Sequence, residues 1–322
     1  MRAVQITETG GPEVMAVVDV ATPEPGPGQV RIAVAAAGLN FIDTYFRSGV
    51  YPGSLPMGLG RECAGTISAV GDGVTTLSVG DRVVTAGTTA SYAEECLAPA
   101  AQVFTLPDGI DLEVAAASAL QGLTAHYLVR STFRLGEGHR CLIHAGAGGV
   151  GGLLIQLAKM LGAEVFTTVG TPEKAEIAAA HGADHVINYR ETDFADAVRA
   201  ELGDAPGLDV VYDGVGADTF DGSLSVLRPR GMMALFGGSS GQVPPFDLQR
   251  LNAGGSLFVT RPSLFHYMDP PEGQQRVDEL YGWIVDGKLD VPIGGRYPIA
   301  EAADAHRALE GRLTTGKILI LP

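Results

Sequence analysis

Three glycines have the spacing of a turn that binds a dinucleotide. Gly146, Gly148 and Gly151 form the pattern G-x-G-x-x-G directly after the apolar run CLIHA. In such a turn the first glycine permits the tight bend, the second lets the backbone approach a pyrophosphate, and the third lets the following helix pack close to the strand. Amide groups at the start of that helix then face the anion. The pattern therefore predicts a nucleotide site at residues 146–151.

The residues after the next apolar run indicate which nucleotide would bind. Sites that prefer NAD carry an acidic residue about 20 residues past the glycines, where it accepts hydrogen bonds from the ribose hydroxyls. Here Gly170 holds that place, and Thr171, Pro172, Glu173 and Lys174 follow. We interpret Glu173, which follows a proline, as a helix-start residue with an outward side chain. A ribose with a 2′-phosphate would meet the ammonium group of Lys174, so the sequence predicts NADPH.

The segments around this turn alternate between apolar strands and helices. The helix after the glycines has a buried face, because apolar residues recur at 150, 153, 154, 157, 158 and 161. This alternation predicts an α/β fold with a Rossmann-type, doubly wound parallel sheet. The predicted strands are 141–146, 163–170, 184–189, 209–216, 232–238 and 256–261.

The rest of the chain has a different pattern. From residue 1 to about residue 106, short runs of Val, Ile, Thr and Ala are broken by Pro and Gly, which predicts a partly open β-barrel. An amphipathic helix at 271–285, a helix within 297–311 and a final strand at 317–322 follow the sheet region. We expect these to return to the barrel. The predicted domains are therefore 1–122 with 264–322, which is discontinuous, and 123–263, which binds the nucleotide.

Composition narrows the classes of partner. The 22 Lys and Arg against 37 Asp and Glu give a net charge of −15, which repels polyanions and argues against nucleic acid. Three cysteines far apart in the sequence argue against a disulfide framework and a clustered metal site, and favour a reducing compartment. The N-terminal MRAVQITETG lacks the apolar core of a signal peptide, and five glycines interrupt the uncharged stretch 141–158. We expect a cytoplasmic protein that does not enter a membrane.

Nine segments in the same order resemble the zinc-independent medium-chain dehydrogenases/reductases, specifically the NADPH:quinone oxidoreductases related to zeta-crystallin. The resemblance spans nearly the whole chain and implies that the partly open barrel is GroES-like. The segments are GLNFIDTYFRSGVYP (38–52), GLGRECAG (58–65), VGDRVV (79–84), GHRCLIHAGAGGVGGLLIQLAK (138–159), TVGTPEKA (168–175), VINYRE (186–191), VYDGVG (211–216), FGGSSG (236–241) and LFVTRPSL (257–264).

The chain lacks the zinc ligands of the related alcohol dehydrogenases. Their catalytic zinc takes a Cys from the segment that reads GLNFID here, and a His from a G-H-E triplet that reads Gly60, Arg61 and Glu62 here. Three cysteines are also too few for their four-Cys structural site. We therefore expect no metal, and reduction of an electrophilic acceptor by NADPH as the natural direction. The resemblance implies hydride transfer from nicotinamide C4 to a quinone or another conjugated carbonyl compound.

The resemblance also implies the residues of the acceptor site, which are Asn40, Tyr45, Tyr51 and Arg261. Asn40 would donate to a carbonyl oxygen or hold the cofactor, and Tyr51 would donate a hydrogen bond. Arg261 would stabilise negative charge on the reduced ring. We expect the two tyrosines in an aromatic-rich loop. The structural alternatives are packing tyrosines, an Asn that satisfies a turn, and an Arg in an ion pair at the end of the sheet.

One residue departs from the family, because Gln121 stands where relatives can carry Lys. The cofactor residues implied by the resemblance fall into three groups. Thr124, Phe236, Gly237 and Ser239 would line the nicotinamide and its ribose, Gly149 and Val150 the pyrophosphate, and Gly170, Lys174, Tyr189 and Arg312 the adenosine phosphate.

Two other functions fit the same motifs. An enoyl or 2-alkenal reductase needs the same geometry to deliver hydride to the β-carbon of an enone. A structural protein could retain NADPH with little turnover. The sequence also leaves open whether electrons pass singly or as hydride, and which acceptor is used. The resemblance further implies a homodimer formed by pairing of the strands at 256–261.

Overall fold

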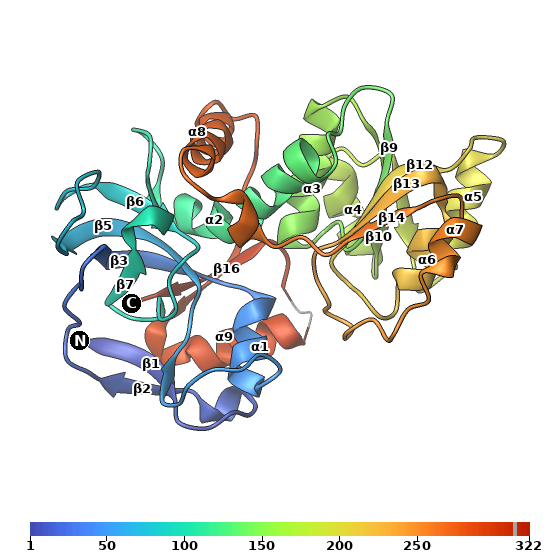
Figure 1. The fold of residues 1–322 in the computed structure, drawn as a ribbon. Coiled ribbons are helices and arrows are strands. Elements are labelled where there is room, and N and C mark those ends of the chain that lie inside the picture. Colours follow the sequence, from blue (N-terminus) through green and yellow to red (C-terminus); the bar gives the residue numbers. More distant parts are fainter. Residues whose placement is uncertain (312–313) are drawn as a thin grey trace. The chain divides into compact units, whose positions relative to one another are not determined.

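The computed structural model of the chain describes residues 1–311 and 314–322 (Figure 1). Arg312, a predicted contact of the adenosine phosphate, lies outside the described residues. The chain folds into two compact units. Unit 1 consists of Met1–Leu123 and Tyr267–Pro322, and unit 2 is Thr124–His266.

Unit 2 contains a six-stranded sheet in which every pair of neighbouring strands is parallel (Figure 1). Its order is β11-β10-β9-β12-β13-β14. The first strand therefore lies in the middle and the order reverses between β9 and β12, as in a dinucleotide-binding sheet. This confirms the predicted Rossmann-type fold. The strands are β9 Arg140–Ile143, β10 Glu164–Val169, β11 His185–Asn188, β12 Leu208–Asp213, β13 Leu227–Leu235 and β14 Phe258–Thr260.

Helices connect the strands of unit 2 and cover the sheet. α3 and α4 both contact β10, whereas α5 and α6 contact each other. Because crossovers between parallel strands are right-handed, the two pairs lie on opposite faces. The uncharged stretch 141–158 is divided between β9 and α3, and no helix in the described ranges is long and apolar enough to cross a membrane. The helices are α3 Gly149–Met160, α4 Pro172–Ala180, α5 Phe194–Leu202, α6 Phe220–Ser225 and α7 Gln249–Ala253.

Unit 1 is built on a seven-stranded sheet. Six of its strands have the order β15-β16-β3-β5-β6-β8, and the seventh, β7, pairs with β3. A three-stranded sheet, β2-β1-β4, accompanies it. The last strand, β16, is antiparallel to β3, so the C-terminal residues complete the sheet that the N-terminal residues begin. The strands are β1 Arg2–Ile6, β2 Ala16–Asp19, β3 Gln29–Leu39, β4 Met57–Gly58, β5 Glu62–Val70, β6 Arg82–Thr85, β7 Glu95–Pro99, β8 Val103–Thr105, β15 Ile293–Pro298 and β16 Lys317–Leu321.

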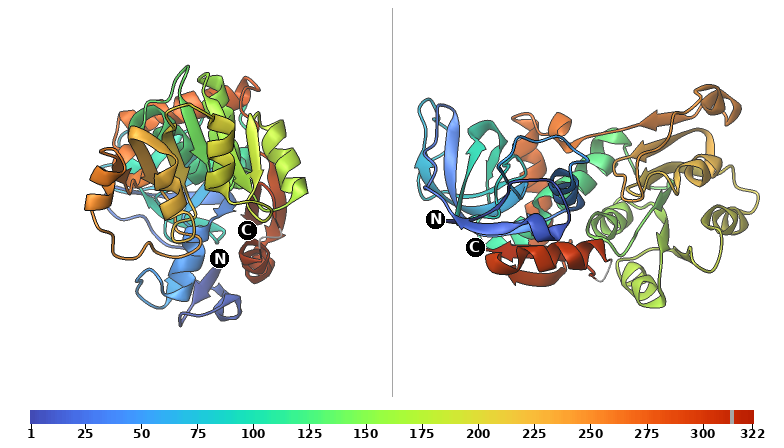
Figure 2. Two further views of the ribbon diagram at one scale, coloured as in Figure 1. Left: turned by 90° about the vertical axis from the view of Figure 1, so that its right-hand side faces the viewer. Right: turned by 90° about the horizontal axis from the view of Figure 1, so that it is seen from below.

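The helices of unit 1 correct two expectations. The N-terminal region is not strands alone, because α1, Phe41–Ser48, follows β3 and carries Tyr45, which we had expected in a loop. The helix predicted within 297–311 is shorter, since 297–298 end β15 and α9 is Ala302–Glu310. α9 contacts both α1 and β16 (Figure 2). The remaining α-helices are α2 Leu112–Tyr127, whose last four residues belong to unit 2, and α8 Glu272–Val285, which is close to the predicted 271–285.

Candidate functional site

The glycine-rich turn of unit 2 is shaped by close contacts that side chains would disrupt. A Cβ on Gly151 would lie 2.2 Å from the carbonyl oxygen of Ala145, so the third glycine lets α3 abut the turn. A Cβ on Gly146 would lie 2.1 Å from Oγ1 of Thr167. The contact is milder at Gly148, whose Cβ would meet the Ala145 oxygen at 3.1 Å. Packing therefore accounts for the first and third glycines better than for the second, which is the one that a pyrophosphate would approach.

The start of α3 offers donors beside this turn. The first hydrogen bond of the helix runs from the amide of Gly152 to the carbonyl oxygen of Gly148, at 2.8 Å. Helix geometry leaves the amides of Gly149, Val150 and Gly151 without a partner in the helix. Three N–H groups and the positive end of the helix dipole thus face the same point, which is the chemistry of an anion site.

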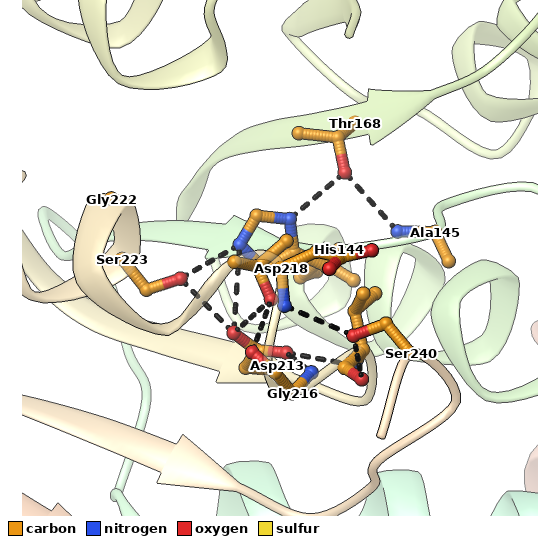
Figure 3. Close-up of polar contacts among 12 residues, drawn as sticks. His144, Ala145, Thr168, Asp213, Gly216, Asp218, Gly222, Ser223 and Ser240 are labelled. Carbon is orange, nitrogen blue, oxygen red and sulfur yellow. Dashed lines mark hydrogen bonds and ion pairs between the residues drawn. The ribbon is translucent and has the colours of Figure 1, made fainter. Parts of the chain in front are cut away.

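A buried hydrogen-bond network holds Ala145, the residue directly before the glycine-rich turn (Figure 3). Nδ1 of His144 lies 2.9 Å from Oγ1 of Thr168, and its Nε2 lies 2.9 Å from Oγ of Ser223. Ser223 in turn lies 3.0 Å from Oδ2 of Asp213. The backbone amide of Ala145 donates to Oγ1 of Thr168 at 3.3 Å. The network therefore joins the ends of β9, β10 and β12 to α6.

The donors and acceptors of this network fix the form of His144. Burial lowers the pKa of His144, although the charge of Asp213 opposes that shift, so the ring is neutral. Asp213 accepts the Ser223 proton, and Ser223 then accepts from Nε2–H of His144. Nδ1 is consequently the acceptor of the Thr168 hydroxyl proton. With that proton committed, Thr168 presents a lone pair to Ala145, whose φ of +57° is unusual for a residue with a Cβ.

Residues predicted to bind the adenosine phosphate gather at the ends of β10 and β11. Oγ1 of Thr171 accepts from the backbone amide of Lys174 at 3.3 Å and caps α4. A Cβ on Gly170 would lie 2.5 Å from the hydroxyl oxygen of Tyr189, so a side chain at residue 170 would displace this ring. Glu173 is exposed in the first turn of α4, as expected. The structure thus brings Gly170, Lys174 and Tyr189 to one edge of the sheet.

The residues predicted near the nicotinamide lie at the same edge, after β13 and β14. A Cβ on Gly237 would lie 2.4 Å from the Gly214 carbonyl oxygen, and the Ser239 amide donates to that oxygen at 3.2 Å. The Phe236 amide donates to the Asp213 carbonyl oxygen at 2.8 Å. Nη1 of Arg261 donates to the carbonyl oxygen of Leu235 at 3.0 Å. Thr124, which is buried on α2, is the first residue of unit 2.

In unit 1, Asn40 belongs to a buried charged cluster. Glu62 and Lys317, both almost fully buried, form an ion pair between β5 and β16. Nδ2 of Asn40 donates to Oε1 of Glu62 at 2.6 Å and, more weakly, to the carbonyl oxygen of Gly38 at 3.5 Å. Its Oδ1 accepts from Nζ of Lys317 at 2.8 Å. The other Glu62 oxygen accepts from the backbone amide of Leu120 in α2.

This arrangement bears on the predicted role of Asn40. Both amide hydrogens are used within the protein, and Gln121 donates to the same Oδ1 at 3.3 Å. Donation by Asn40 to an acceptor therefore stays a prediction, and the geometry favours a positioning role. Lys317 is not among the predicted site residues, and Glu62 enters the prediction only within a triplet that lacks zinc ligands. Nothing in the sequence links two residues 255 positions apart.

Tyr45 and Tyr51 come together in an aromatic cluster with Phe46 and Arg61. The rings of Tyr45 and Tyr51 meet edge to face with centroids 5.3 Å apart, and those of Phe46 and Tyr51 with centroids 5.5 Å apart. The guanidinium carbon of Arg61 lies 3.6 Å from the centroid of Phe46. The cluster presents a cation and edge-on rings side by side, a suitable surface for a flat, electron-poor acceptor.

Asp43, on α1, interacts with Arg61 of the aromatic cluster and with the buried residues Asn40 and Tyr92. Its Oδ2 accepts from the Asn40 backbone amide at 2.8 Å and from the Tyr92 hydroxyl at 3.1 Å. Burial raises the pKa of Asp43 to about 7, although both hydrogen bonds oppose that shift. Further along α1, Arg47 is paired with Glu310 and lies 2.9 Å from Nδ1 of His306. Burial beside that guanidinium lowers the pKa of His306 to about 3.

The donor set of unit 1 does not fit a zinc ion. At the triplet 60–62 the middle residue is a cation, Arg61, and Glu62 is committed to Lys317. In the described part of the chain, no three His, Cys, Asp or Glu residues are grouped so that they could hold a metal. The three cysteines are free and buried, yet the Sγ atoms of Cys63 and Cys96 lie 3.6 Å apart despite their distance in sequence.

Comparisons with known proteins agree with this architecture. Residues 26–132 match the family described as "Alcohol dehydrogenase GroES-like domain" and residues 149–268 match "Zinc-binding dehydrogenase". A quinone oxidoreductase of Pseudomonas aeruginosa is 47% identical, over 100% of this chain and 99% of the relative. A 2-haloacrylate reductase of a Burkholderia species is 42% identical, over 99% and 98%. The structure of Escherichia coli quinone oxidoreductase with NADPH is 43% identical, with a TM-score of 0.97 over the whole of both chains.

The His144 network generates a first prediction. Thr168→Val keeps the shape of the side chain but leaves Nδ1 of His144 and the Ala145 amide without their partner. Loss of about 1.4 kcal/mol of turn stabilisation would raise the Kd for NADPH about tenfold, measured by quenching of protein fluorescence. Thr85→Val in unit 1 is the control, because Thr85 likewise donates one hydrogen bond, here to the carbonyl oxygen of Gln102, and accepts one from a backbone amide. An unchanged Kd in Thr168→Val, or an equal rise in both variants, would contradict this role.

The raised pKa of Asp43 generates a second prediction. The folded state holds this proton more tightly than the unfolded state, so ionisation destabilises the fold as the pH rises from about 4 to about 7. Asp43→Asn keeps an acceptor oxygen but cannot ionise. The free energy of unfolding of the parent, relative to Asp43→Asn, should therefore fall over that interval and be constant above it. Urea unfolding at a series of pH values measures the difference, and parallel curves would refute the assignment.

Proposed function

The chain belongs to the quinone oxidoreductase family of the medium-chain dehydrogenases/reductases, and we propose that it reduces quinones with NADPH, by hydride transfer and without zinc. The observation that carries the proposal is the edge of the parallel sheet in unit 2. There, an anion site at the start of α3 follows β9, the start of α4 with Lys174 follows β10, and Tyr189, which meets Gly170, follows β11. Full-length relatives named quinone oxidoreductases support the choice of acceptor.

The residues at this edge fit NADPH. Gly148 leaves the pyrophosphate close access to the backbone, and the amides of Gly149 and Val150 donate to it. Lys174 supplies the charge that the 2′-phosphate needs, and Tyr189 covers Gly170 beside it. The Escherichia coli relative has been solved with the same cofactor. We also retain the predicted domain limits, with residues 123–263 holding the nucleotide.

NADPH, when bound, supplies the hydride, and the protein supplies position and electrostatics. Phe236, Gly237 and Ser239 keep the chain close to β12 at the strand ends where the nicotinamide would lie. Arg261 is held there by its bond to Leu235 and offers its remaining N–H groups to developing negative charge. In unit 1, Tyr45 and Tyr51 provide the aromatic surface for the acceptor.

Two further proposals concern the whole molecule. We propose that the protein works in the cytoplasm, on the basis of its three free cysteines. We also propose that two chains pair through β14, which is an edge strand of its sheet and exposes 55% of Phe258. Sedimentation velocity measures that pairing, and a single monomeric species would contradict it.

A second candidate function is reduction of a conjugated carbon–carbon double bond, the enoyl or 2-alkenal reductase alternative. The relative named 2-haloacrylate reductase favours it, because that protein is similar over nearly the full chain. Hydride delivery to a β-carbon needs the same cofactor position and the same stabilisation of negative charge on oxygen.

Cofactor choice can be tested at Lys174. Lys174→Ala should lower kcat/KM for NADPH by about 10- to 100-fold, because a charge-assisted hydrogen bond contributes about 1.5–3 kcal/mol. The value for NADH, which lacks the 2′-phosphate, should stay within about twofold, from steady-state rates with 1,4-naphthoquinone. Lys159→Ala is the control, because it removes a lysine of the same unit that is paired with Asp184. Equal losses with both cofactors would contradict the assignment.

Acceptor choice can be tested with the unmodified enzyme. We expect NADPH oxidation with 1,4-naphthoquinone at a higher kcat/KM than with a trans-2-alkenal or a trans-2-enoyl thioester. The measurement is the initial rate of NADPH absorbance loss for each acceptor. Turnover of the alkenal or thioester alone would favour the second candidate, and no turnover of any acceptor would favour a binding protein.

A further inference from the structure

Arg61 is a half-buried cation with an unusual environment. Among residues 1–311 and 314–322, no hydrogen bond or ion pair reaches its guanidinium group, which is stacked on Phe46. Buried arginines elsewhere in unit 1 have such partners. Arg47 pairs with Glu310, and Arg276 pairs with Glu272. A guanidinium group has five N–H donors, and leaving them unsatisfied in a partly buried place is unfavourable.

The carboxylates near Arg61 do not balance its charge. Glu62, the next residue, is committed to Lys317, Asn40 and the Leu120 amide. Asp43 interacts electrostatically with Arg61, but burial raises the pKa of that carboxyl to about 7, so it carries only part of a charge near neutral pH. Arg61 itself stays protonated, although burial lowers its pKa. The place therefore keeps a local excess of positive charge.

The surroundings of Arg61 define what could neutralise it. Phe46 covers one face of the guanidinium plane, which leaves the in-plane N–H groups to meet a ligand. Tyr51 contacts the other rings edge-on, and its hydroxyl has no hydrogen-bond partner among the residues that the structure describes. Phe41 and Leu55, exposed by 37% and 43%, flank the cluster in the sequence. A flat apolar ring with an anionic oxygen at its rim matches this combination of an aromatic surface, a hydroxyl donor and a cation.

We propose that Arg61 makes this site select conjugated acceptors that carry an anionic oxygen, such as ionised hydroxyquinones, over neutral acceptors of the same size. The inference rests on the proposed function, because it assigns the aromatic cluster of unit 1 to the acceptor. Beyond that function, the preferred substrate carries a negative charge, and Arg61 is the residue that recognises this charge. Arg61 is a specificity residue here, whereas in the sequence alone it marks only the position of a missing zinc ligand.

Binding of two ligands that differ only in charge tests the proposal without any turnover. 2-Naphthoate and 2-naphthamide share one flat ring system, and only the first is an anion. Titration calorimetry of the full chain with NADP⁺ present should give the parent a Kd about tenfold lower for the naphthoate, the preference expected for one partly solvated charge-assisted contact. This preference should shrink as salt is raised. No preference in the parent would overturn the proposal directly.

Two variants and a control assign the preference to Arg61. Arg61→Gln should reduce the naphthoate preference to within about twofold of unity, and Arg61→Lys, which keeps the charge, should retain part of it. Arg307→Gln removes one positive charge of the same unit at an exposed pair with Asp304, and should leave the preference unchanged. If Arg61→Gln keeps the preference, or if Arg307→Gln loses it equally, the proposal fails. If Arg61→Gln does not fold, Arg61→Lys and the salt dependence of the parent decide.

Turnover provides the link to the reaction. 2-Hydroxy-1,4-naphthoquinone is an anion at neutral pH, whereas 1,4-naphthoquinone is neutral. The ratio of kcat/KM for the first quinone to kcat/KM for the second should be about tenfold lower in Arg61→Gln than in the parent. Comparison of the two enzymes cancels the different intrinsic reactivity of the two quinones. Equal loss with both quinones would show that Arg61 does not discriminate by charge. Absence of any quinone turnover in the parent would instead contradict the proposed function, and the naphthoate titration would still judge the inference.

Discussion

The buried ion pair between Lys317 and Glu62 is the constraint on which the acceptor side of the molecule depends. Taking two charges out of water is costly, and the attraction between them compensates only when the remaining hydrogen-bonding atoms are also satisfied. Here they are, because Asn40 contacts both partners and the Leu120 amide reaches the second oxygen of Glu62. The pair thereby fixes β5, β16, the start of α1 and the middle of α2 with respect to one another. Removing one partner alone would leave an isolated buried charge, at a cost of about 3–5 kcal/mol.

This constraint explains why the aromatic cluster is well positioned. Asn40 precedes α1, and the backbone amide of Asn40 is held by Asp43 in the first turn of the same helix. The direction of α1 therefore follows from the ion pair, and with it the places of Tyr45 and Phe46. A Cβ on Gly38 would lie 2.1 Å from Oε1 of Glu62, so β3 can approach the pair only with a glycine at residue 38. Unit 2 uses a related principle, since hydrogen bonds from the neutral His144 to Thr168 and, through Ser223, to the Asp213 carboxylate join the ends of β9, β10 and β12.

The sequence predicted those parts whose signals are local. Six parallel strands and α3 were predicted because apolar runs and a helical period of apolar residues are properties of short segments. The glycine turn was predicted for the same reason, and the structure gives a steric cause for two of its three glycines. α1 was missed because the aromatic residues of 41–51 do not show a clean period, although Asn40 and Asp43 have the spacing of a helix start. The pairing of Lys317 with Glu62 and the approach of Cys63 to Cys96 depend on tertiary folding, which no local pattern encodes.

The charge at Arg61 must be judged against the charge of the whole chain. A protein with a net charge of −15 repels anions at long range, so an anionic acceptor would approach against the average field. At physiological salt, however, exposed charges are screened beyond about 8 Å, whereas a half-buried cation acts at contact with little screening. Lys317 neutralises Glu62, and burial keeps Asp43 partly protonated, so the local balance beside Phe46 is positive even though the global balance is negative. The long-range field would then slow the encounter and the local contact would lower the rate of release, which places the effect of Arg61 in the lifetime of the complex more than in its formation.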